Sequence, residues 1–244
     1  MRTGVDTPTA LRQDAPSPGA APNGAPGPRG AAARPLAAAA FALGSLAIIV
    51  FALGWRDTFG VLTRQYPFAA GFVKLFFLGT FGELLKRRLN SGAWALDHPL
   101  ERAVIWGLFG LWFTVAFPAF AFAVDGLVER GFWPARVPGL PAWLWRAFSQ
   151  SFWLNGLGMY GWGMMVTHNY LDFLVHGRWR RWSLRAYADQ ADTRFVLAFL
   201  PKTLLFWIAA QTFNYSLPAE WRVFVAALLA IVLGFLLGVG GRRG

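Results

Sequence analysis

The residues with the clearest chemical potential lie together in one apolar stretch of the chain. His168, Asp172 and His176 follow one another at intervals of four, so in an α-helix they form a row along one face. Such a row can bind a metal ion, relay protons or fix the orientation of its own side chains. Metal sites normally use at least three protein ligands, and the remaining histidine, His98, is expected in a loop. We therefore predict a structural His168–Asp172 pair and assign no metal or cofactor, with metal binding by the row as an alternative.

Ionisable and amide side chains also interrupt two other apolar runs. Lys74 and Glu83 share a predicted helix, but a spacing of nine residues places them on opposite faces, so they cannot pair with each other. Lys202 follows Pro201, which leaves a backbone carbonyl without its helical partner. Ionisable groups inside membrane segments are candidates for function. We expect seven residues to form a polar core or a pore lining: Lys74, Glu83, His168, Asp172, Lys202, Gln211 and Asn214.

The same side chains also have structural explanations. Hydrogen bonds from Gln211 and Asn214 between helices would order a bundle without lining a pore. Lys74 or Lys202 could pair across helices with an acidic residue, which would satisfy both charges without any transport.

No catalytic pattern accompanies these residues. The acidic residues are scattered, and neither G-x-S-x-G nor H-E-x-x-H occurs in the sequence. The chain has no cysteine, which excludes disulfides, thiolate catalysis and cysteine-ligated metal centres. We therefore do not expect an enzyme.

The composition is too apolar for an ordinary soluble domain. Hydrophobic residues make up 56% of the 244 residues and the mean hydropathy is +0.41, whereas soluble domains are about 45–50% apolar. Backbone groups in lipid must be hydrogen-bonded within their own segment, so the apolar runs should be helices. We predict an all-α, polytopic helical membrane bundle with about six spans, at 36–54, 66–89, 103–124, 152–175, 195–215 and 221–240.

The first part of the chain has a different composition. Residues 1–35 hold seven of the 15 prolines and no aromatic residue. Such a segment cannot bury enough apolar area to offset the entropy lost on ordering. We therefore predict a disordered tail over 1–35 and a membrane domain over 36–244.

Positive charge is concentrated in the predicted loops. The net charge is +11, and 15 Lys and Arg residues fall on the termini and on loops 86–102 and 176–194, against six on the other three loops. The positive-inside rule then predicts cytoplasmic termini and explains the charge without nucleic acid. The bilayer itself is the expected partner, with anionic lipid head groups contacting the basic loops, notably Arg178, Arg180 and Arg181.

Six residues near the C-terminus have a recognisable spacing: Trp207, Gln211, Asn214, Tyr215, Pro218 and Arg222. This pattern resembles the C-terminal signature of the Mpv-seventeen/peroxisomal-membrane-protein family, roughly W-P-x-x-Q-x-x-N-F followed by P-x-x-x-R. The chain differs at Ile208, where the family has proline, and in a spacing from Asn214 to Pro218 that is one residue shorter. The resemblance implies a small helical membrane protein of a family often described as channel-like pores for small solutes.

We therefore predict an integral membrane protein with a channel-like pore for small solutes. Two alternatives are a membrane scaffold that binds lipid or a partner without transport, and an intramembrane metal-binding protein or enzyme. Arg222 is expected at the membrane surface or as a cap of the last helical hairpin. The bacterial inner membrane is the expected location, because the tail lacks an organellar presequence and arginine greatly outnumbers lysine.

Overall fold

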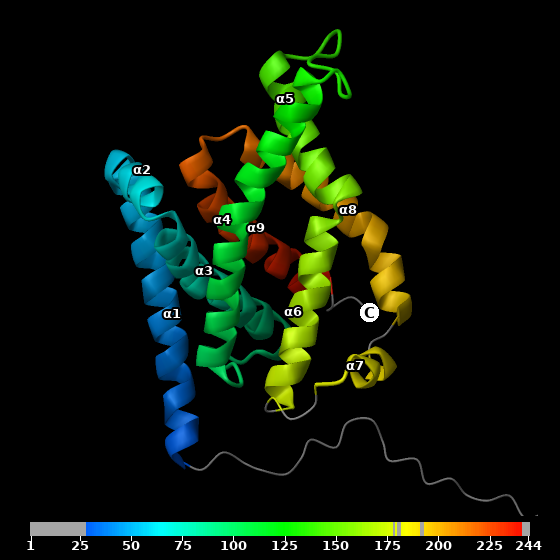
Figure 1. The fold of residues 1–244 in the computed structure, drawn as a ribbon. Helices are drawn as coiled ribbons and strands as arrows, with labels where there is room; N and C mark the ends of the chain where they lie inside the picture. The colour runs from blue at the N-terminus through cyan, green and yellow to red at the C-terminus, as the bar shows by residue number, and fades with distance from the viewer. Residues whose placement is uncertain (1–27, 178, 180–181, 191–192, 241–244) are drawn as a thin grey trace, which may run out of the picture.

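The computed structural model describes residues 28–177, 179, 182–190 and 193–240, and side chains from residue 35 onward except within 189–203, 233–234 and 236–240. In this part of the chain every regular element is a helix, as predicted (Figure 1). The helices are α1 (Pro28–Gly54), α2 (Arg56–Gln65), α3 (Pro67–Ser91), α4 (Pro99–Glu129), α5 (Ala142–Ser151), a π-helical turn η1 (Phe152–Leu157), α6 (Tyr160–His176), α7 (Leu184–Gln190), α8 (Thr193–Tyr215) and α9 (Ala219–Gly240).

Three of these helices are long and apolar enough to cross a membrane: Pro35–Gly54 of α1, and the whole of α3 and α4. They contain the three predicted spans 36–54, 66–89 and 103–124 almost entirely. Each span is a long apolar run, and its backbone N–H and C=O groups can all be hydrogen-bonded in lipid only if the run is a helix. Large hydrophobic side chains on α1 and α4 point outward, including Leu43, Leu46, Leu108 and Trp112.

Six spans are not supported by helix length and composition in the described part of the chain. The predicted span 152–175 is divided between η1 and α6, and α6 has only 17 residues, which is about 26 Å of helix against a ~30 Å hydrocarbon layer. The break falls at Gly158 and Met159, where Met159 has a left-handed φ of 45°. A Cβ at Gly158 would lie 2.7 Å from the Leu154 carbonyl oxygen, so a larger residue would force the backbone to shift at this break.

The last two predicted spans, 195–215 and 221–240, coincide with α8 and α9. Each includes side chains outside the described residues. These helices form a hairpin, as predicted, and α9 packs along α3 in the bundle.

Helix α1 begins inside the segment predicted as a tail, and the boundary at residue 35 stays a prediction. Residues 28–35 belong to α1, which begins at Pro28 and contains Pro35. Proline is well tolerated in the first turn of a helix, and the alanines on both sides of Pro35 are strong helix formers. Residues 1–27 of the predicted tail lie outside the described residues.

Helix α3 packs against α4 and α9 and also contacts α1, beside which it lies in Figure 1. Gly71 of α3 and Gly110 of α4 bring their backbones together, because a Cβ at Gly110 would lie only 2.1 Å from the Gly71 carbonyl oxygen. Gly82 faces Ile231 of α9 less closely, because a Cβ there would lie 3.4 Å from the Ile231 Cγ1 atom, an ordinary van der Waals distance. Small residues at such crossings let helices approach closely, which is the usual basis of packing in membranes.

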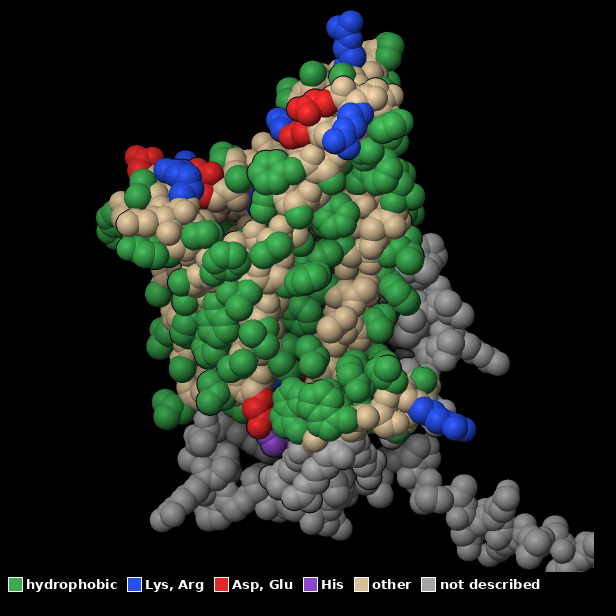
Figure 2. Space-filling model, viewed as in Figure 1, with side chains coloured by type: hydrophobic (Ala, Val, Ile, Leu, Met, Phe, Trp, Pro, Cys, Tyr) green, Lys and Arg blue, Asp and Glu red, His purple; other side chains and the backbone are tan. Residues whose placement is uncertain are grey.

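Charged side chains are separated from the middle of the molecule. Figure 2 shows hydrophobic side chains over the central part of one face, with Lys, Arg, Asp and Glu gathered toward its two ends. A broad apolar belt with polar ends is the surface that a bilayer requires.

Candidate functional site

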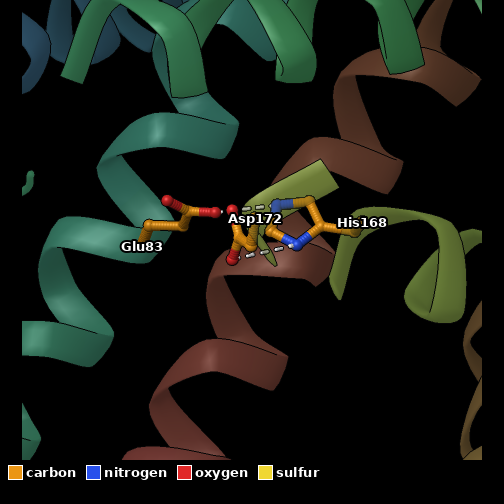
Figure 3. Close-up of side chains that lie close together, drawn as sticks. All are labelled: Glu83, His168 and Asp172. Atoms are coloured by element: carbon orange, nitrogen blue, oxygen red, sulfur yellow. Dashed lines mark ion pairs between the residues drawn. The ribbon is translucent and has the colours of Figure 1, made fainter. Parts of the chain in front are cut away.

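Five polar side chains from three helices meet near one end of the bundle. Glu83 comes from α3, Arg102 and Trp106 from α4, and His168 and Asp172 from α6. Figure 3 shows His168 and Asp172 of α6 lying opposite Glu83. We call these five residues the Glu83 cluster.

The spacing of the cluster residues follows from helix geometry. Arg102 and Trp106 are four residues apart on α4, as are His168 and Asp172 on α6, so each pair shares a helix face. Gly79 lies about one turn before Glu83 on α3, and a Cβ there would be 2.5 Å from the Trp106 indole. The absence of that Cβ lets Trp106 lie against α3 and reach Glu83.

Arg102 connects the two acidic residues of the cluster. Its Nη1 lies 3.0 Å from Glu83 Oε2 and 2.8 Å from Asp172 Oδ1, and its Nε donates to the Asp97 carbonyl oxygen at 2.9 Å. One guanidinium therefore joins α3, α4 and α6.

His168 and Trp106 complete the network around Glu83. His168 Nε2 is 2.7 Å from Glu83 Oε1, and its Nδ1 is 3.7 Å from Asp172 Oδ2. Trp106 Nε1 donates to Glu83 Oε1 at 3.0 Å. Arg102 thus brings a positive charge to both carboxylates, and His168 adds a ring nitrogen to the partners of Glu83. The Arg102 side chain is 9% exposed and that of Glu83 12%, and buried charges persist only when they are compensated in this way.

The Glu83 cluster forms one wall of a cavity of about 490 Å³. Lys86 and Arg87, on the next turn of α3, are exposed and also line it. The rest of the lining mixes apolar and polar side chains: Leu96, Met164, Met165 and Trp207, with Asn90, Ser91, Asp97, Asn169 and His176. Cavities of about 300–1,000 Å³ with an apolar wall and a few polar groups are typical of small-molecule sites.

A second polar group lies deeper on α8. Asn214 is fully buried and donates from Nδ2 to Gln211 Oε1 at 2.7 Å. Trp207 precedes Gln211 by one turn and lines the cavity. The Trp207 Nε1 and Asn214 Oδ1 atoms are buried and have no hydrogen-bond partner in the described part of the chain, and the same holds for the Tyr160 hydroxyl.

The structure thus brings together only part of the predicted polar core. Glu83, His168 and Asp172 meet at the cavity, while Gln211 and Asn214 pair with each other. Lys74 points to neither group and contacts Thr63. The side chain of Lys202 lies outside the described residues.

The predicted row of His168, Asp172 and His176 does not form a three-ligand site. His176 is exposed, and its Nδ1 contacts the Asp172 backbone oxygen at 2.8 Å rather than the carboxylate. Glu83 instead supplies the third group, and Glu83, His168 and Asp172 each offer one ligand atom, all within 4.8 Å of one another. The group of Glu83, His168 and Asp172 includes a residue from α3, and the spacing of residues along α6 cannot reveal it.

The spacing pattern near the C-terminus has a clear structural basis. Arg222 donates from Nε to the Leu217 carbonyl oxygen at 3.3 Å and from Nη2 to the Tyr215 carbonyl oxygen at 3.4 Å. Arg222 therefore caps the α8–α9 hairpin, which is one of the two roles predicted for it. The Tyr215 hydroxyl donates to the Phe117 carbonyl oxygen at 3.1 Å and attaches the hairpin to α4. Pro218 lies in the turn between α8 and α9.

No protein-family model, curated protein or solved structure matches the chain. The resemblance to the Mpv-seventeen family therefore stays a prediction that rests on six spaced residues.

Proposed function

We propose that this protein is an integral membrane protein whose Glu83-cluster cavity binds small polar solutes on a channel-like path through the bilayer. The observation that supports this proposal is the hydrogen-bonded network of Glu83, Arg102, His168 and Asp172 on the wall of a cavity of about 490 Å³ between apolar helices. Charged groups within membrane helices are costly, and they commonly mark solute or ion pathways.

The chemistry of the cavity indicates what kind of solute it would accept. Arg102 and His168 can donate hydrogen bonds, and Glu83 and Asp172 can accept them. Asp172 is the most exposed of the four, at 26%, so it is the group most open to a solute. A small solute with both polar and charged groups fits this wall best, while the indoles of Trp106 and Trp207 can pack against its carbon atoms.

A polar row on α8 extends the proposed path inward. Trp207 borders the cavity, Gln211 follows one turn later, and Asn214 lies three residues further. The buried Trp207 Nε1 and Asn214 Oδ1 atoms have no protein partner among the described residues, and such atoms favour contact with water or solute. We assign these three side chains to the lining beyond the cavity.

We further propose six crossings with both termini in the cytoplasm. The support is the charge distribution, with 15 Lys and Arg residues on one set of loops and six on the other. Helix α9 packs along α3, which is itself long enough to cross. A distant relationship to the Mpv-seventeen family and a bacterial inner membrane are part of the same proposal.

The direct test is solute flux into liposomes that contain the purified protein. The probes are glycine, glutamate, arginine and glucose, compared with protein-free liposomes. Asp172→Asn removes a cavity carboxylate, and Asp125→Asn is the matched control, because Asp125 also pairs with an arginine, Arg146, at 2.5 Å but lies outside the cavity. We expect Asp172→Asn to change flux of the charged probes about tenfold, equivalent to ~1.4 kcal/mol. Equal flux in the two variants, or none above empty liposomes, contradicts the proposal.

Metal binding is a second candidate function, because Glu83, His168 and Asp172 offer three ligand atoms within 4.8 Å. Two carboxylates and an imidazole suit Zn²⁺ or Mn²⁺. Arg102 binds both carboxylates, so a cation would have to displace the guanidinium. Metal binding is therefore the weaker of the two proposed functions. Protein dialysed against Zn²⁺ or Mn²⁺ is assayed for bound metal. One ion per chain, lost in His168→Ala, would support it, and metal-free wild-type protein would exclude it.

A further inference from the structure

A second cavity lies at the other end of α3, away from the Glu83 cluster. Its volume is about 180 Å³, and it lies between α2, α3, α4 and the first turn of α9. Lys74, on its wall, precedes Glu83 by nine residues, which is about 14 Å along the helix. The polar residues that line this cavity are Thr63, Arg64, Lys74, Thr114, Glu220 and Arg222.

Lys74 is buried and forms no ion pair with a described residue. It is 4% exposed, and its Nζ donates to Thr63 Oγ1 at 2.7 Å and lies 4.2 Å from the centre of the Phe59 ring. Among the described residues no carboxylate forms an ion pair with it. An ammonium group has three donors, and the Thr63 hydroxyl accounts for one of them.

The other charged groups of the cavity leave an excess of positive charge. Glu220 is its only carboxylate among the described lining residues, and Glu220 Oε1 is held by Arg64 Nη1 at 2.5 Å. Arg222 caps the α8–α9 hairpin with Nε and Nη2, and no hydrogen bond joins its Nη1 to another described residue. Three cations therefore face one carboxylate, an excess of two positive charges in a partly desolvated space.

We propose that this second cavity binds a phosphate group. A phosphate monoester or inorganic phosphate carries about −1.5 to −2 at neutral pH, which matches the excess charge. Lysine and arginine are the usual phosphate ligands, and the Thr63 hydroxyl can add a donor. The volume of about 180 Å³ is large enough for the group, since one water molecule occupies ~30 Å³.

The phosphate can come from solution or from a lipid head group. Trp55 and Tyr66 flank α2, one of the helices that line this cavity, and are 58% and 56% exposed. Such aromatic residues typically lie at the level of lipid head groups. The chemistry at the protein is the same for both sources, so two probes distinguish them.

The experiment measures binding of two probes to the full chain in maltoside detergent by calorimetry, at constant ionic strength. The probes are sodium phosphate and a short-chain phosphatidylglycerol. Binding of the first assigns the site to free phosphate, and binding of the second alone assigns it to a lipid head group. Binding of neither probe overturns the proposal.

Four variants locate the binding. Lys74→Met should weaken it about tenfold, or ~1.4 kcal/mol, and Arg64→Gln, at an exposed residue that does not threaten folding, should weaken it as well. Glu220→Gln should tighten it, because this substitution removes the competing carboxylate. The control is Arg136→Met, which deletes a charge from the exposed loop between α4 and α5 and should leave binding unchanged. Unaltered binding in Arg64→Gln and Glu220→Gln would refute the site. The assay does not involve the Glu83 cavity, so its result is independent of solute flux.

Discussion

Arg102 and Asp172 are 70 residues apart in the chain and form an ion pair of 2.8 Å. The pair joins the first turns of α4 to the end of α6. Because the same nitrogen also binds Glu83, removing the guanidinium leaves two carboxylates without their strongest partner at the wall of the cavity. The stability of this end of the bundle should therefore depend strongly on Arg102.

Arg102→Met should lower the free energy of unfolding by about 3–5 kcal/mol, the usual cost of leaving a buried charge unpaired. The measurement is thermal unfolding in detergent. Arg146→Met is the control, because its pair with Asp125 has a similar short contact but the Arg146 side chain is 61% exposed. Exposed pairs contribute about 0–1 kcal/mol. Equal losses in the two variants would contradict the prediction.

The triple variant Glu83→Gln, Arg102→Met, Asp172→Asn should recover most of the stability lost in Arg102→Met. The reason is that no uncompensated charge is left when all three partners are neutral. A triple variant as unstable as Arg102→Met would show that the side-chain shapes, rather than the charges, hold α3, α4 and α6 together.

Asn214→Leu should reduce solute flux with little effect on stability. Asn214 donates to Gln211, but its own Oδ1 is buried without a partner in the described part of the chain. Removing that atom relieves a desolvation cost that offsets the lost hydrogen bond, so the net change in stability should be below ~1 kcal/mol. Flux and thermal unfolding are measured together.

Thr212→Val is the control for Asn214→Leu. Thr212 lies on the same helix, and its hydroxyl donates only to the Ile208 carbonyl oxygen at 2.7 Å, outside the row of Trp207, Gln211 and Asn214. If both variants conduct solutes equally well, the structural explanation of Asn214, hydrogen bonding that orders the bundle, is the correct one.

The topology can be tested by labelling single cysteines, because the native chain has none. Ser91→Cys lies at the end of α3, and Ser216→Cys in the turn between α8 and α9, and both sites are exposed. Six crossings place these two positions on opposite sides of the membrane. A membrane-impermeant maleimide should therefore label Ser216→Cys in intact spheroplasts and Ser91→Cys only after inside-out vesicles are prepared. Labelling of both from one side would refute six crossings.

The helical class and the long helices could be predicted because they depend on local sequence. The runs at 66–89 and 103–124 are long, apolar and without an internal break, and α3 and α4 extend them by only a few residues. The stretch 152–175 is of similar length but contains polar side chains such as Asn155, His168 and Asp172, and it is divided at Gly158 and Met159. Its backbone path depends on contacts with other helices, which include Ser151 Oγ donating to the Ile208 carbonyl oxygen of α8 at 2.7 Å.

The site could be predicted only residue by residue. Glu83, His168 and Asp172 were candidates because each is an ionisable group in an apolar run. Their partner Arg102 precedes the predicted span 103–124 by one residue, so the sequence alone places its charge in the loop 86–102. Its spacing of four residues from Trp106 was the available signal, since both then share one face of α4. Which helices face each other is a tertiary property that periodicity along one helix cannot supply.

The crossing of α3 and α4 gives the sharpest test of the packing. Gly110→Ala should destabilise the protein by about 1–3 kcal/mol, the usual cost of overpacking, because its Cβ would lie 2.1 Å from the Gly71 carbonyl oxygen and backbone cannot move aside as a side chain can. Gly126→Ala is the matched control on the same helix, where a Cβ meets nothing within 4 Å. At position 126, alanine loses less backbone entropy on folding than glycine does, so Gly126→Ala should raise the free energy of unfolding by up to ~1 kcal/mol. Opposite shifts in the thermal midpoint are expected, and a similar shift in both variants would show that α3 and α4 do not cross at Gly71 and Gly110.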